Sequence, residues 1–327
     1  MLAYIARRLL LMVPTLFVAS ILIFVIIQLP PTDFVSALVA QAAQSGSSAD
    51  EQTLAALRHQ YGLDQPLHLQ YLHWVGGMIQ GDLGYSFEWQ RPVSSLILDR
   101  LLFTVVLAVS AIVVMWVVAI PIGVYSATHQ YSPLDHVLTF VGFVGLAVPD
   151  FLLALIYLFV SALVFDMSVG GLFSPQYEDA PWSLAKAWDL FVHLFWPTLI
   201  LAAGGTAQLI RIMRSSMLDV LRQPFVTTAR AKGLAERVAV WKYAVRVAIN
   251  PLVSVMGMQI PALISGATIV GAVLSIPTIG PMFLRSLINV DMYLAGAILL
   301  FAVVLLMVGN LLADIALAVL DPRIRYQ

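Results

Sequence analysis

Phe225–Ala235 reads FVTTARAKGLA, a polar and basic stretch that lies between two long apolar segments. It forms the middle of a basic segment that runs from Arg211 to Arg246. The apolar segments on either side, about Leu190–Ile210 and Leu252–Ile276, are each long enough to cross a lipid bilayer as a helix. A cationic segment of this length between two spans lies outside the bilayer and is available to bind a partner there. The identity of that partner determines what the protein does.

The composition is that of a protein embedded in a membrane. Hydrophobic residues make up 61% of the 327 residues and charged residues only 11%, whereas a soluble domain carries about 25% charged residues. The chain contains no cysteine, which excludes disulfides, thiolate metal sites and cysteine nucleophiles. We therefore expect an all-α polytopic membrane protein.

The first apolar run is Leu9–Leu29, which ends at Pro30-Pro31. A helix of this length is roughly 31 Å long and crosses a bilayer. A signal peptide would have a shorter apolar core and a small-residue cleavage site, so we expect an uncleaved first span. Five more candidate spans follow at about Leu101–Thr128, Val137–Phe165, Leu190–Ile210, Leu252–Ile276 and Tyr293–Leu320. Six spans place both termini on the same side of the membrane.

The distribution of Lys and Arg orients these spans, because cytoplasmic loops carry the excess of positive charge. With the N-terminus inside, twelve of the 17 basic residues lie on the inner side and five on the outer side. The inner set is Arg7, Arg8, Arg211, Arg214, Arg222, Arg230, Lys232, Arg237, Lys242, Arg246, Arg323 and Arg325, and the outer set is Arg58, Arg91, Arg100, Lys186 and Arg285. We therefore expect both termini and the basic segment to be cytoplasmic.

The largest outer segment follows the first span and is acidic. Between Pro31 and Asp99 it carries seven carboxylates, and only three arginines lie in it or at its edge. Helical spacing of apolar residues predicts two short helices in it, over Glu51–Tyr61 and Leu69–Ile79.

Prolines and carboxylates interrupt the apolar runs. Each of Pro121, Pro149, Pro197 and Pro261 removes a backbone hydrogen bond and can kink a helix; they fit either irregular packing or a bend that shapes a central pathway. Asp150 and Asp314 lie within candidate spans, where a carboxylate is costly and is a candidate for function. Pro149 and Asp150 are therefore candidate pathway or gating residues, while Asp314 is a candidate interfacial cap or a residue that makes a hydrogen bond within the helix bundle.

No catalytic constellation stands out in the sequence. It has neither a Gly-Lys-Ser/Thr phosphate loop nor a His-Glu-x-x-His pair, so we expect no enzyme activity, no metal and no cofactor in this chain. The spacing of His59, His68 and His73 is more typical of a solvated surface than of a metal site. An ion-coupled secondary carrier would have paired charges within its spans and often an internal repeat, and the sequence has neither.

Local signals predict a helix–turn–helix within the basic segment. Pro224 forces a break, Thr227 or Thr228 can cap a new short helix, and Gly233 is well placed as its left-handed C-terminal residue. An amphipathic stretch, Ala235–Ile249, then leads into the next span.

Three environments fit this helix–turn–helix. Small side chains at Ala229 and Ala231 favour insertion into a groove of another protein. A lipid-facing amphipathic anchor, attracted to anionic headgroups, is the second, although such anchors usually present Trp, Phe or Leu. A solvated loop is the third.

The segment resembles the EAA loop of the membrane subunits of bacterial ABC importers. Thr227-Thr228-Ala229-Arg230-Ala231-Lys232-Gly233-Leu234 is similar to the variant of oligopeptide/dipeptide/nickel-type permeases, and Ile249-Asn250-Pro251-Leu252 fits its distal end. Thr227-Thr228 replaces the Glu-Ala of the general loop, so an ionic role of that Glu is missing here. Further similarities to this group follow in order along nearly the whole chain: Tyr4-Ile5-Ala6-Arg7-Arg8-Leu9-Leu10, Leu29-Pro30-Pro31-Thr32-Asp33, Tyr61-Gly62-Leu63-Asp64-Gln65-Pro66, Gly81-Asp82-Leu83-Gly84-Tyr85-Ser86 and Leu320-Asp321-Pro322-Arg323-Ile324-Arg325-Tyr326.

The resemblance implies a type I ABC importer permease fold in a bacterial inner membrane, and the long outer segment is similar to the B-type member of the permease pair. Three parts are then expected. Residues 1–30 form the N-terminal transmembrane helix and 31–99 a periplasmic segment. Residues 100–327 form the core permease domain, with five transmembrane helices and the cytoplasmic EAA-like loop 211–250.

The resemblance also implies a division of labour between subunits. A second homologous permease completes the pathway, two cytoplasmic ATPases bind ATP and Mg, and a periplasmic binding protein delivers the substrate; no nucleic acid is involved. Residues 227–234 would then couple this chain to an ATPase. The expected cargo is short peptides, with an oligosaccharide, an opine or nickel as alternatives, and the aromatic residues Tyr85, Phe87 and Trp89 suit either an oligosaccharide or contact with the binding protein.

Overall fold

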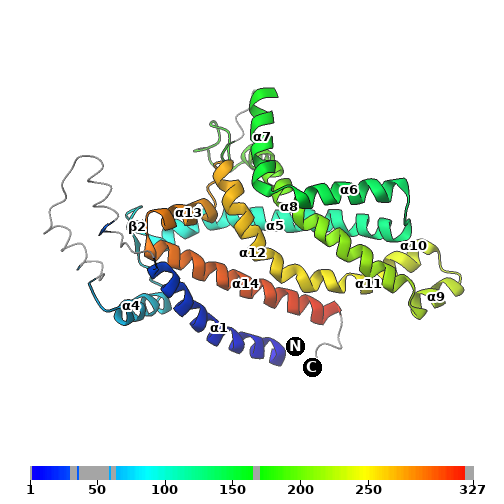
Figure 1. The fold of residues 1–327 in the computed structure, drawn as a ribbon, viewed down its shortest axis with the longest axis horizontal. Helices are drawn as coiled ribbons and strands as arrows, with labels where there is room; N and C mark the ends of the chain where they lie inside the picture. Colours follow the sequence, from blue (N-terminus) through cyan, green and yellow to red (C-terminus); the bar gives the residue numbers. More distant parts are fainter. Residues whose placement is uncertain (1, 30–34, 37–58, 60–63, 165–169, 321–327) are drawn as a thin grey trace. The chain divides into compact units, whose positions relative to one another are not determined.

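The computed structural model describes residues 2–29, 35–36, 59, 64–164 and 170–320, and most of these residues lie in helices (Figure 1). The chain divides into two compact units. The first unit comprises Met1–Arg7, Phe103–Pro277 and Leu306–Gln327, and the second comprises Arg8–Leu102 and Thr278–Leu305. Each unit is described by itself.

The described elements follow one another as a series of helices with a single small hairpin. They are α1 (Leu2–Gln28), α4 (Leu67–Ile79), β1 (Tyr85–Ser86), β2 (Arg91–Pro92), α5 (Val93–Thr128), α6 (Pro133–Ala147), α7 (Asp150–Val164), α8 (Leu184–Leu221), α9 (Pro224–Ala231), α10 (Glu236–Val238), the π-helix η1 (Ala239–Ala244), α11 (Val245–Ala248), α12 (Asn250–Val273), α13 (Ile279–Ile288) and α14 (Met292–Leu320).

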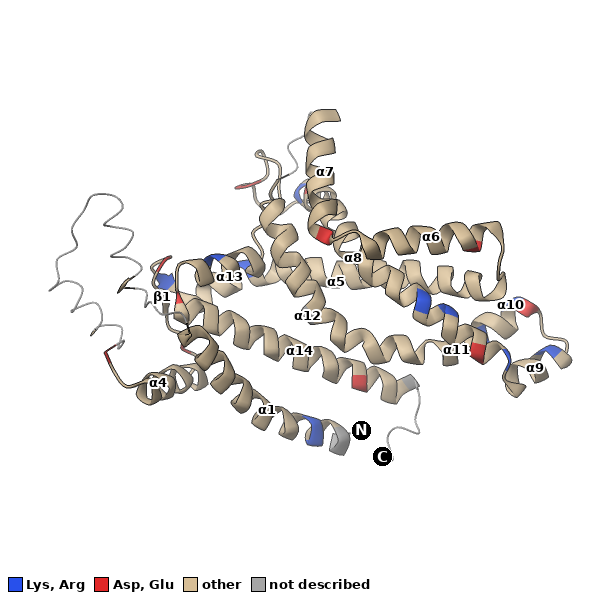
Figure 2. Ribbon diagram, viewed as in Figure 1, with Lys and Arg blue, Asp and Glu red and all other residues tan. Residues whose placement is uncertain are grey.

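Several helices are long and apolar enough to cross a membrane. Four satisfy this alone: Ile5–Gln28, Val93–Thr128, Leu184–Leu221 and Met292–Val319. Two bent pairs, Pro133–Ala147 with Asp150–Val164 and Glu236–Ala248 with Asn250–Ile260, raise the number of candidate spans to as many as six. Figure 2 shows long stretches of these helices without charged residues, and α12 carries no Asp, Glu, Lys or Arg at all. The elements match the apolar runs of the sequence.

The α8 helix lies at the centre of the first unit. It packs against α6, α7, α9, η1 and α12. Its neighbours share a core of Leu, Met, Ala and Val side chains. Fully buried members are Leu107, Met115, Leu209, Met213, Met217, Leu252 and Leu274, each at most 2% exposed.

The predicted single span Val137–Phe165 is wrong in one respect, because the chain breaks within it (Phe165 itself lies outside the described residues). The helices α6 and α7 meet at an angle of 97°, and Figure 1 shows α7 turning away from α6. Pro149 favours the break at this point, since a proline disfavours the helical conformation for the residue before it. Val148 accordingly has φ −89° and ψ 121°, an extended conformation.

The second unit contains two apolar clusters and the hairpin. The first cluster joins α13 to the start of α5 and of α14. The second packs Trp74 of α4, 5% exposed, against Ile23, Phe24 and Ile27 of α1. The predicted helix Leu69–Ile79 is confirmed by α4, whereas the predicted helix Glu51–Tyr61 lies, apart from His59, outside the described residues.

A buried carboxylate ties the hairpin to the start of α14. The side chain of Asp291 accepts hydrogen bonds from the Ser86 hydroxyl and from the backbone N–H groups of Glu88 and Leu294. Burial raises the pKa of Asp291 above its ordinary value, against the opposing effect of these hydrogen bonds. An ion pair between Glu88 and Arg285 adds a second link from the hairpin region to α13.

Candidate functional site

The basic segment begins where α8 ends. Gln223 is extended, with φ −70° and ψ 146°, and Pro224 is the first residue of α9. Proline suits this position because its missing N–H would have no partner in the first turn and its φ is already helical. The prediction that Thr227 or Thr228 caps this helix is therefore wrong. Both lie inside α9, where the Thr228 hydroxyl donates to the carbonyl of Pro224 at 2.8 Å.

The prediction for Gly233 is confirmed. Its φ is +77°, in the left-handed region. The N–H of Gly233 donates to the carbonyl of Arg230 at 2.9 Å, and the N–H of Leu234 donates to the carbonyl of Ala229 at 3.3 Å. This pair of bonds is the Schellman motif, which satisfies the last carbonyls of a helix while the chain reverses.

Beyond the turn, α10, η1 and α11 lead back toward α12 as a nearly continuous helical stretch. The α9 helix packs against η1 and α8, with Val226 and Ala229 at the contact, 0% and 5% exposed. Of the two alanines expected to face a partner, Ala231 is exposed and Ala229 lies against the chain itself. The exposed members of the predicted site are Thr227, Thr228, Arg230, Ala231, Lys232, Gly233 and Leu234.

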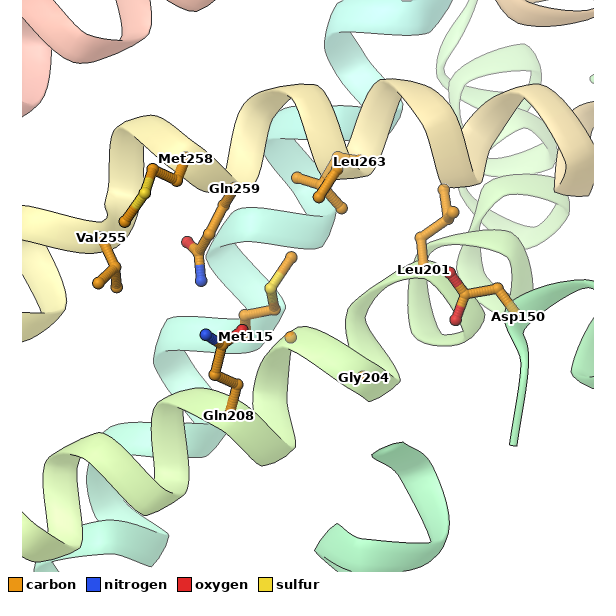
Figure 3. Close-up of a pocket in the computed structure, with 11 residues that line it drawn as sticks. Met115, Asp150, Leu201, Gly204, Gln208, Val255, Met258, Gln259 and Leu263 are labelled. Atoms are coloured by element: carbon orange, nitrogen blue, oxygen red, sulfur yellow. The ribbon is translucent and has the colours of Figure 1, made fainter. Parts of the chain in front are cut away.

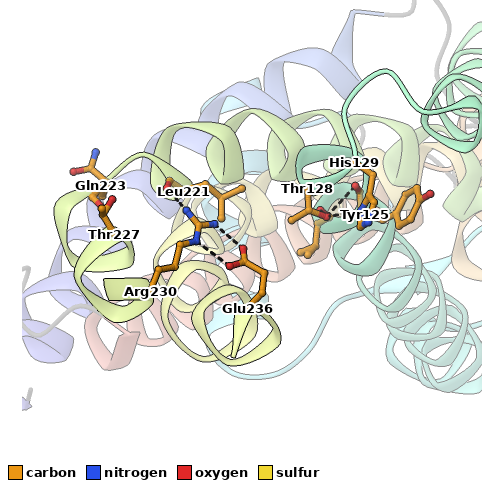
Figure 4. A network of polar contacts seen from close by, with 9 residues as sticks. Tyr125, Thr128, His129, Leu221, Gln223, Thr227, Arg230 and Glu236 are labelled. Atoms are coloured by element: carbon orange, nitrogen blue, oxygen red, sulfur yellow. Dashed lines mark hydrogen bonds and ion pairs between the residues drawn. The ribbon is translucent and has the colours of Figure 1, made fainter. Parts of the chain in front are cut away.

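An ion pair closes the helix–turn–helix (Figure 4). The guanidinium of Arg230 makes two bonds to the carboxylate of Glu236, Nη2 to Oε1 at 2.6 Å and Nε to Oε2 at 2.9 Å. Its Nη1 also donates to the carbonyl of Leu221 at 3.5 Å. Arg230 therefore links the end of α8, α9 and the start of α10, and hydrogen bonding to Glu236 raises the pKa of Arg230 further above its ordinary value.

The energy of this pair is modest. The side chain of Arg230 is 39% exposed and that of Glu236 is 61% exposed, and exposed ion pairs contribute roughly 0–1 kcal/mol. The pair therefore fixes the geometry of the turn more than it stabilises the fold. The sequence did not indicate this role of Glu236. Glu236 follows Arg230 by six residues, with Gly233 between them, and this spacing does not predict an ion pair.

A second ion pair anchors the start of α6 to α8. The Arg214 guanidinium donates to Asp135 Oδ2 at 3.0 Å, and the Asp135 side chain is only 2% exposed. The same oxygen accepts the N–H of Tyr131 at 3.0 Å. This contact joins the beginning of the basic segment to α6 and was not identified from the sequence.

Asp150, the other predicted site residue, lines a cavity of about 280 Å³ in the first unit. Helices α5, α7, α8 and α12 form the walls (Figure 3). The lining residues are Met115, Asp150, Leu201, Gly204, Gly205, Gln208, Val255, Met258, Gln259, Ala262 and Leu263. Pro149 is not among them, although it sets the bend that delivers Asp150 to the wall.

Gly266 of α12 leaves the space that the Asp150 carboxylate occupies. A Cβ at this position would lie 3.0 Å from Asp150 Oδ2 and 3.2 Å from a methyl group of Leu201. The other polar groups of the cavity are Gln208 and Gln259, whose amides point toward one another from α8 and α12 in Figure 3. Neither glutamine was identified as a site residue from the sequence. The feature that could have indicated them is an amide side chain within an apolar run.

In the part of the chain that the structure describes, no group of three His, Cys, Asp or Glu side chains is placed to hold a metal ion. Two features remain as candidate sites: the exposed helical turn, and a small, mainly apolar cavity with three polar side chains, Asp150, Gln208 and Gln259.

Known families match this chain along almost its whole length. Residues 119–326 match the family described as "Binding-protein-dependent transport system inner membrane component". Residues 1–108 match "Binding-prot-dependent transport system membrane comp, N-term".

Individual relatives are similar over the full chain. The chain is 37% identical over 328 residues to the oligopeptide transport system permease protein AppB of Bacillus subtilis (strain 168), covering 100% of both chains. It is 33% identical over 331 residues to the glutathione transport system permease protein GsiC of Salmonella typhimurium, again covering 100% of both. The GsiC protein of Escherichia coli O6:H1 is 33% identical over 328 residues with the same coverage.

Proposed function

Because this chain belongs to the family of inner membrane components of binding-protein-dependent transport systems, we propose that it carries short peptides into the cytoplasm as the permease subunit of an ATP-driven importer. As a family member it is a multi-pass inner membrane protein and a transport subunit, not an enzyme. The names of its relatives, which refer to oligopeptides and glutathione, support the peptide assignment.

The alternatives, an oligosaccharide, an opine or nickel, have less support. An oligosaccharide site would use exposed aromatic faces. Phe87 is only 4% exposed and stacks edge-on against Tyr293. Trp89 has the guanidinium groups of Arg100 and Arg285 about 5 Å from its ring centre. Two of the three aromatic residues that suited a sugar are therefore already occupied within the chain.

The observation that carries the proposal is the exposed helical turn in a chain that matches this family throughout. Residues Thr227, Thr228, Arg230, Ala231, Lys232, Gly233 and Leu234 would contact a cytoplasmic ATPase, with Ala229 supporting them from behind. The closed turn favours docking into a protein groove over a solvated loop, because its backbone is already ordered and little conformational entropy is lost on binding.

The proposed assembly contains this chain, a second homologous permease, two ATPases that bind ATP and Mg, and a periplasmic binding protein. Both termini of this chain would be cytoplasmic, as the excess of basic residues on that side indicates. ATPase closure would displace the turn. Since the turn packs on α8 and continues into α10–α12, this displacement would reach the walls of the cavity around Asp150, and the bend at Pro149 is the candidate gate. Alternating access of this kind requires different contacts in two states.

Purification in mild detergent, followed by reconstitution into proteoliposomes, tests the proposal. The expected partners are a second permease, ATPases with phosphate loops and a binding protein, and uptake of radiolabelled trialanine should require ATP. A chain that purifies alone and transports without ATP would contradict the proposal.

A charge swap tests the role of the turn. Arg230→Glu places two carboxylates opposite each other and should abolish uptake while the protein still inserts. Arg230→Glu combined with Glu236→Arg restores the attraction and should recover much of the uptake if Arg230 acts by holding the turn. Normal uptake by Arg230→Glu alone would exclude this segment as the ATPase contact.

A further inference from the structure

We propose that the cavity around Asp150 is a transit site for the free amino terminus of the transported peptide: Asp150 receives the ammonium group, and Gln208 and Gln259 receive the amide groups that follow it. This inference rests on the proposed function, because it names the part of a peptide that the cavity recognises.

The size of the cavity limits how much of a substrate it can hold. Its volume is about 280 Å³, at the lower end of the roughly 300–1,000 Å³ of pockets that enclose a drug-sized ligand. The cavity therefore has room for the first residues of a peptide, from the ammonium group onward. A site of this size suits a substrate that passes through it.

The Asp150 carboxylate has no cationic partner among the described residues, so a cationic ligand would stabilise it. The two arginines in the second half of α8 are engaged elsewhere: Arg214 pairs with Asp135, and Arg211 lies 5.4 Å from the ring centre of Phe143. An unpaired carboxylate among apolar helices is costly, and an alkylammonium group would offset that cost.

A simpler role for Asp150 is to stabilise the N-terminus of α7, where a carboxylate interacts favourably with the helix dipole. The side chain is directed otherwise. Its Oδ2 lies against Gly266 of α12, and none of the described hydrogen bonds caps α7 with this carboxylate. The helix dipole accounts for a carboxylate in the first turn of α7 but not for its position in the cavity wall, and a ligand would explain that position.

The two amides complete the recognition. Figure 3 shows Asp150 beside Leu201 at one end of the cavity and Gln208 and Gln259 toward the other, with Met115 between them. The Oε1 atom of Gln259 is buried and has no hydrogen-bond partner in the described structure. A buried acceptor without a donor is unfavourable. The N–H of a peptide bond supplies that donor at the same time as the ammonium group meets Asp150.

Uptake by the reconstituted complex tests this inference with two probes, trialanine and N-acetyl-trialanine, which lacks the ammonium group. Asp150→Asn should lower the initial rate of trialanine uptake about 10-fold or more, because a hydrogen bond between an ammonium group and a carboxylate is stronger than one to a neutral amide. Asp150→Glu should retain most of the rate. Uptake of N-acetyl-trialanine, however slow, should be equal in the wild type and Asp150→Asn. The matched control Asp179→Asn removes an exposed carboxylate and should change neither rate.

A second measurement reads the charge of the cavity without transport. The chain has no cysteine, and Gly204 has room for one, because a Cβ there has no neighbour closer than 3.9 Å. In Gly204→Cys, a cationic aminoethyl thiosulfonate should react faster than its anionic sulfonatoethyl analogue. Adding Asp150→Asn should reduce this preference about 10-fold, as expected for removal of a charge at close range.

The outcomes separate the inference from the function on which it rests. Trialanine uptake that Asp150→Asn leaves unchanged, or lowers together with N-acetyl-trialanine, would overturn the amino-terminal site while peptide import stands. An unchanged preference between the two thiol reagents would also overturn it. A wild-type complex that takes up neither peptide would overturn the proposed function itself, even if the reagents report a negative cavity.

Discussion

Gly233 determines how the exposed turn is closed. Its φ of +77° is strained for any residue with a Cβ, yet a Cβ at this position would have nothing within 4 Å. The requirement for glycine is therefore purely one of backbone conformation. Neither packing nor a close contact contributes to it.

This distinction gives a prediction for two substitutions. Gly233→Ala should destabilise the turn by about 1–2 kcal/mol, because alanine resists the left-handed conformation, whereas Gly233→Asn should cost less, because asparagine visits it more readily. Uptake by the reconstituted complex should follow the same order: wild type, then Asn, then Ala. An equal loss of uptake in both variants would indicate that the partner requires the absence of a side chain at position 233, and that the backbone conformation is not the cause.

At the scale of residues, the sequence predicted what depends on local conformation. Gly233 was identified because a glycine after a short helical run signals a left-handed end. The Thr227 and Thr228 caps were wrong because Pro224 begins α9 three residues earlier. The Arg230–Glu236 pair was missed because it exists only once the turn has brought the two residues together. Gln208 and Gln259 face one another across the cavity only because α8 packs against α12.

At the scale of elements, close approach between α5 and α8 depends on Gly123. A Cβ there would lie 2.6 Å from the Cβ of Met213 and 3.2 Å from the backbone nitrogen of Arg214. Neither atom can move away by rotation of a side chain. Gly142, on α6, offers the opposite case, because its nearest neighbour would be 3.9 Å away.

We therefore expect opposite results from two identical substitutions. Gly123→Ala should force the helices apart and lower stability by about 1–3 kcal/mol. Gly142→Ala should be neutral or stabilising by about 0.5–1 kcal/mol, because alanine is the better helix former. Thermal unfolding of the purified protein in detergent measures both changes. Similar midpoints for the two variants would contradict the close packing of α5 on α8.

Apolar length predicted where the helices lie, but it did not predict the break between α6 and α7. A proline inside a span is compatible with a continuous kinked helix, and Pro121 and Pro197 lie inside α5 and α8 in that way. At Pro149 the chain breaks by 97°. The difference depends on which neighbouring helices are available to pack against each half, and this information is not local to the sequence.

At the scale of the whole molecule, the chain has no cysteine, so its orientation can be measured without background labelling. Gln130→Cys, in the exposed turn between α5 and α6, and Asp179→Cys, in the exposed segment before α8, should lie on opposite sides of the membrane. A membrane-impermeant maleimide should label Asp179→Cys in intact spheroplasts and Gln130→Cys only in inverted vesicles. The reverse pattern would place both termini outside and would contradict the orientation inferred from Lys and Arg.

The fold class and the family were accessible from sequence because both depend on features spread over the entire chain. Hydrophobic runs decide that the protein is a membrane protein, and the segment around Gly233 together with motifs near both ends indicated an importer permease. The division into two compact units was not predicted, since it follows from which helices pack together and not from the order of apolar runs.

The π-helix η1 at Ala239–Ala244 has a consequence for reading the helices on either side of it. A π turn contains an additional residue relative to an α turn, and each residue of an α-helix advances the side chains by about 100°. Residues before η1 are therefore out of phase with those after it. Counting residues in heptads therefore does not show which side of the turn lies on the same face as the cavity-lining side of α12. Deletion of one residue within η1 would rotate the turn about the helix axis by roughly 100°.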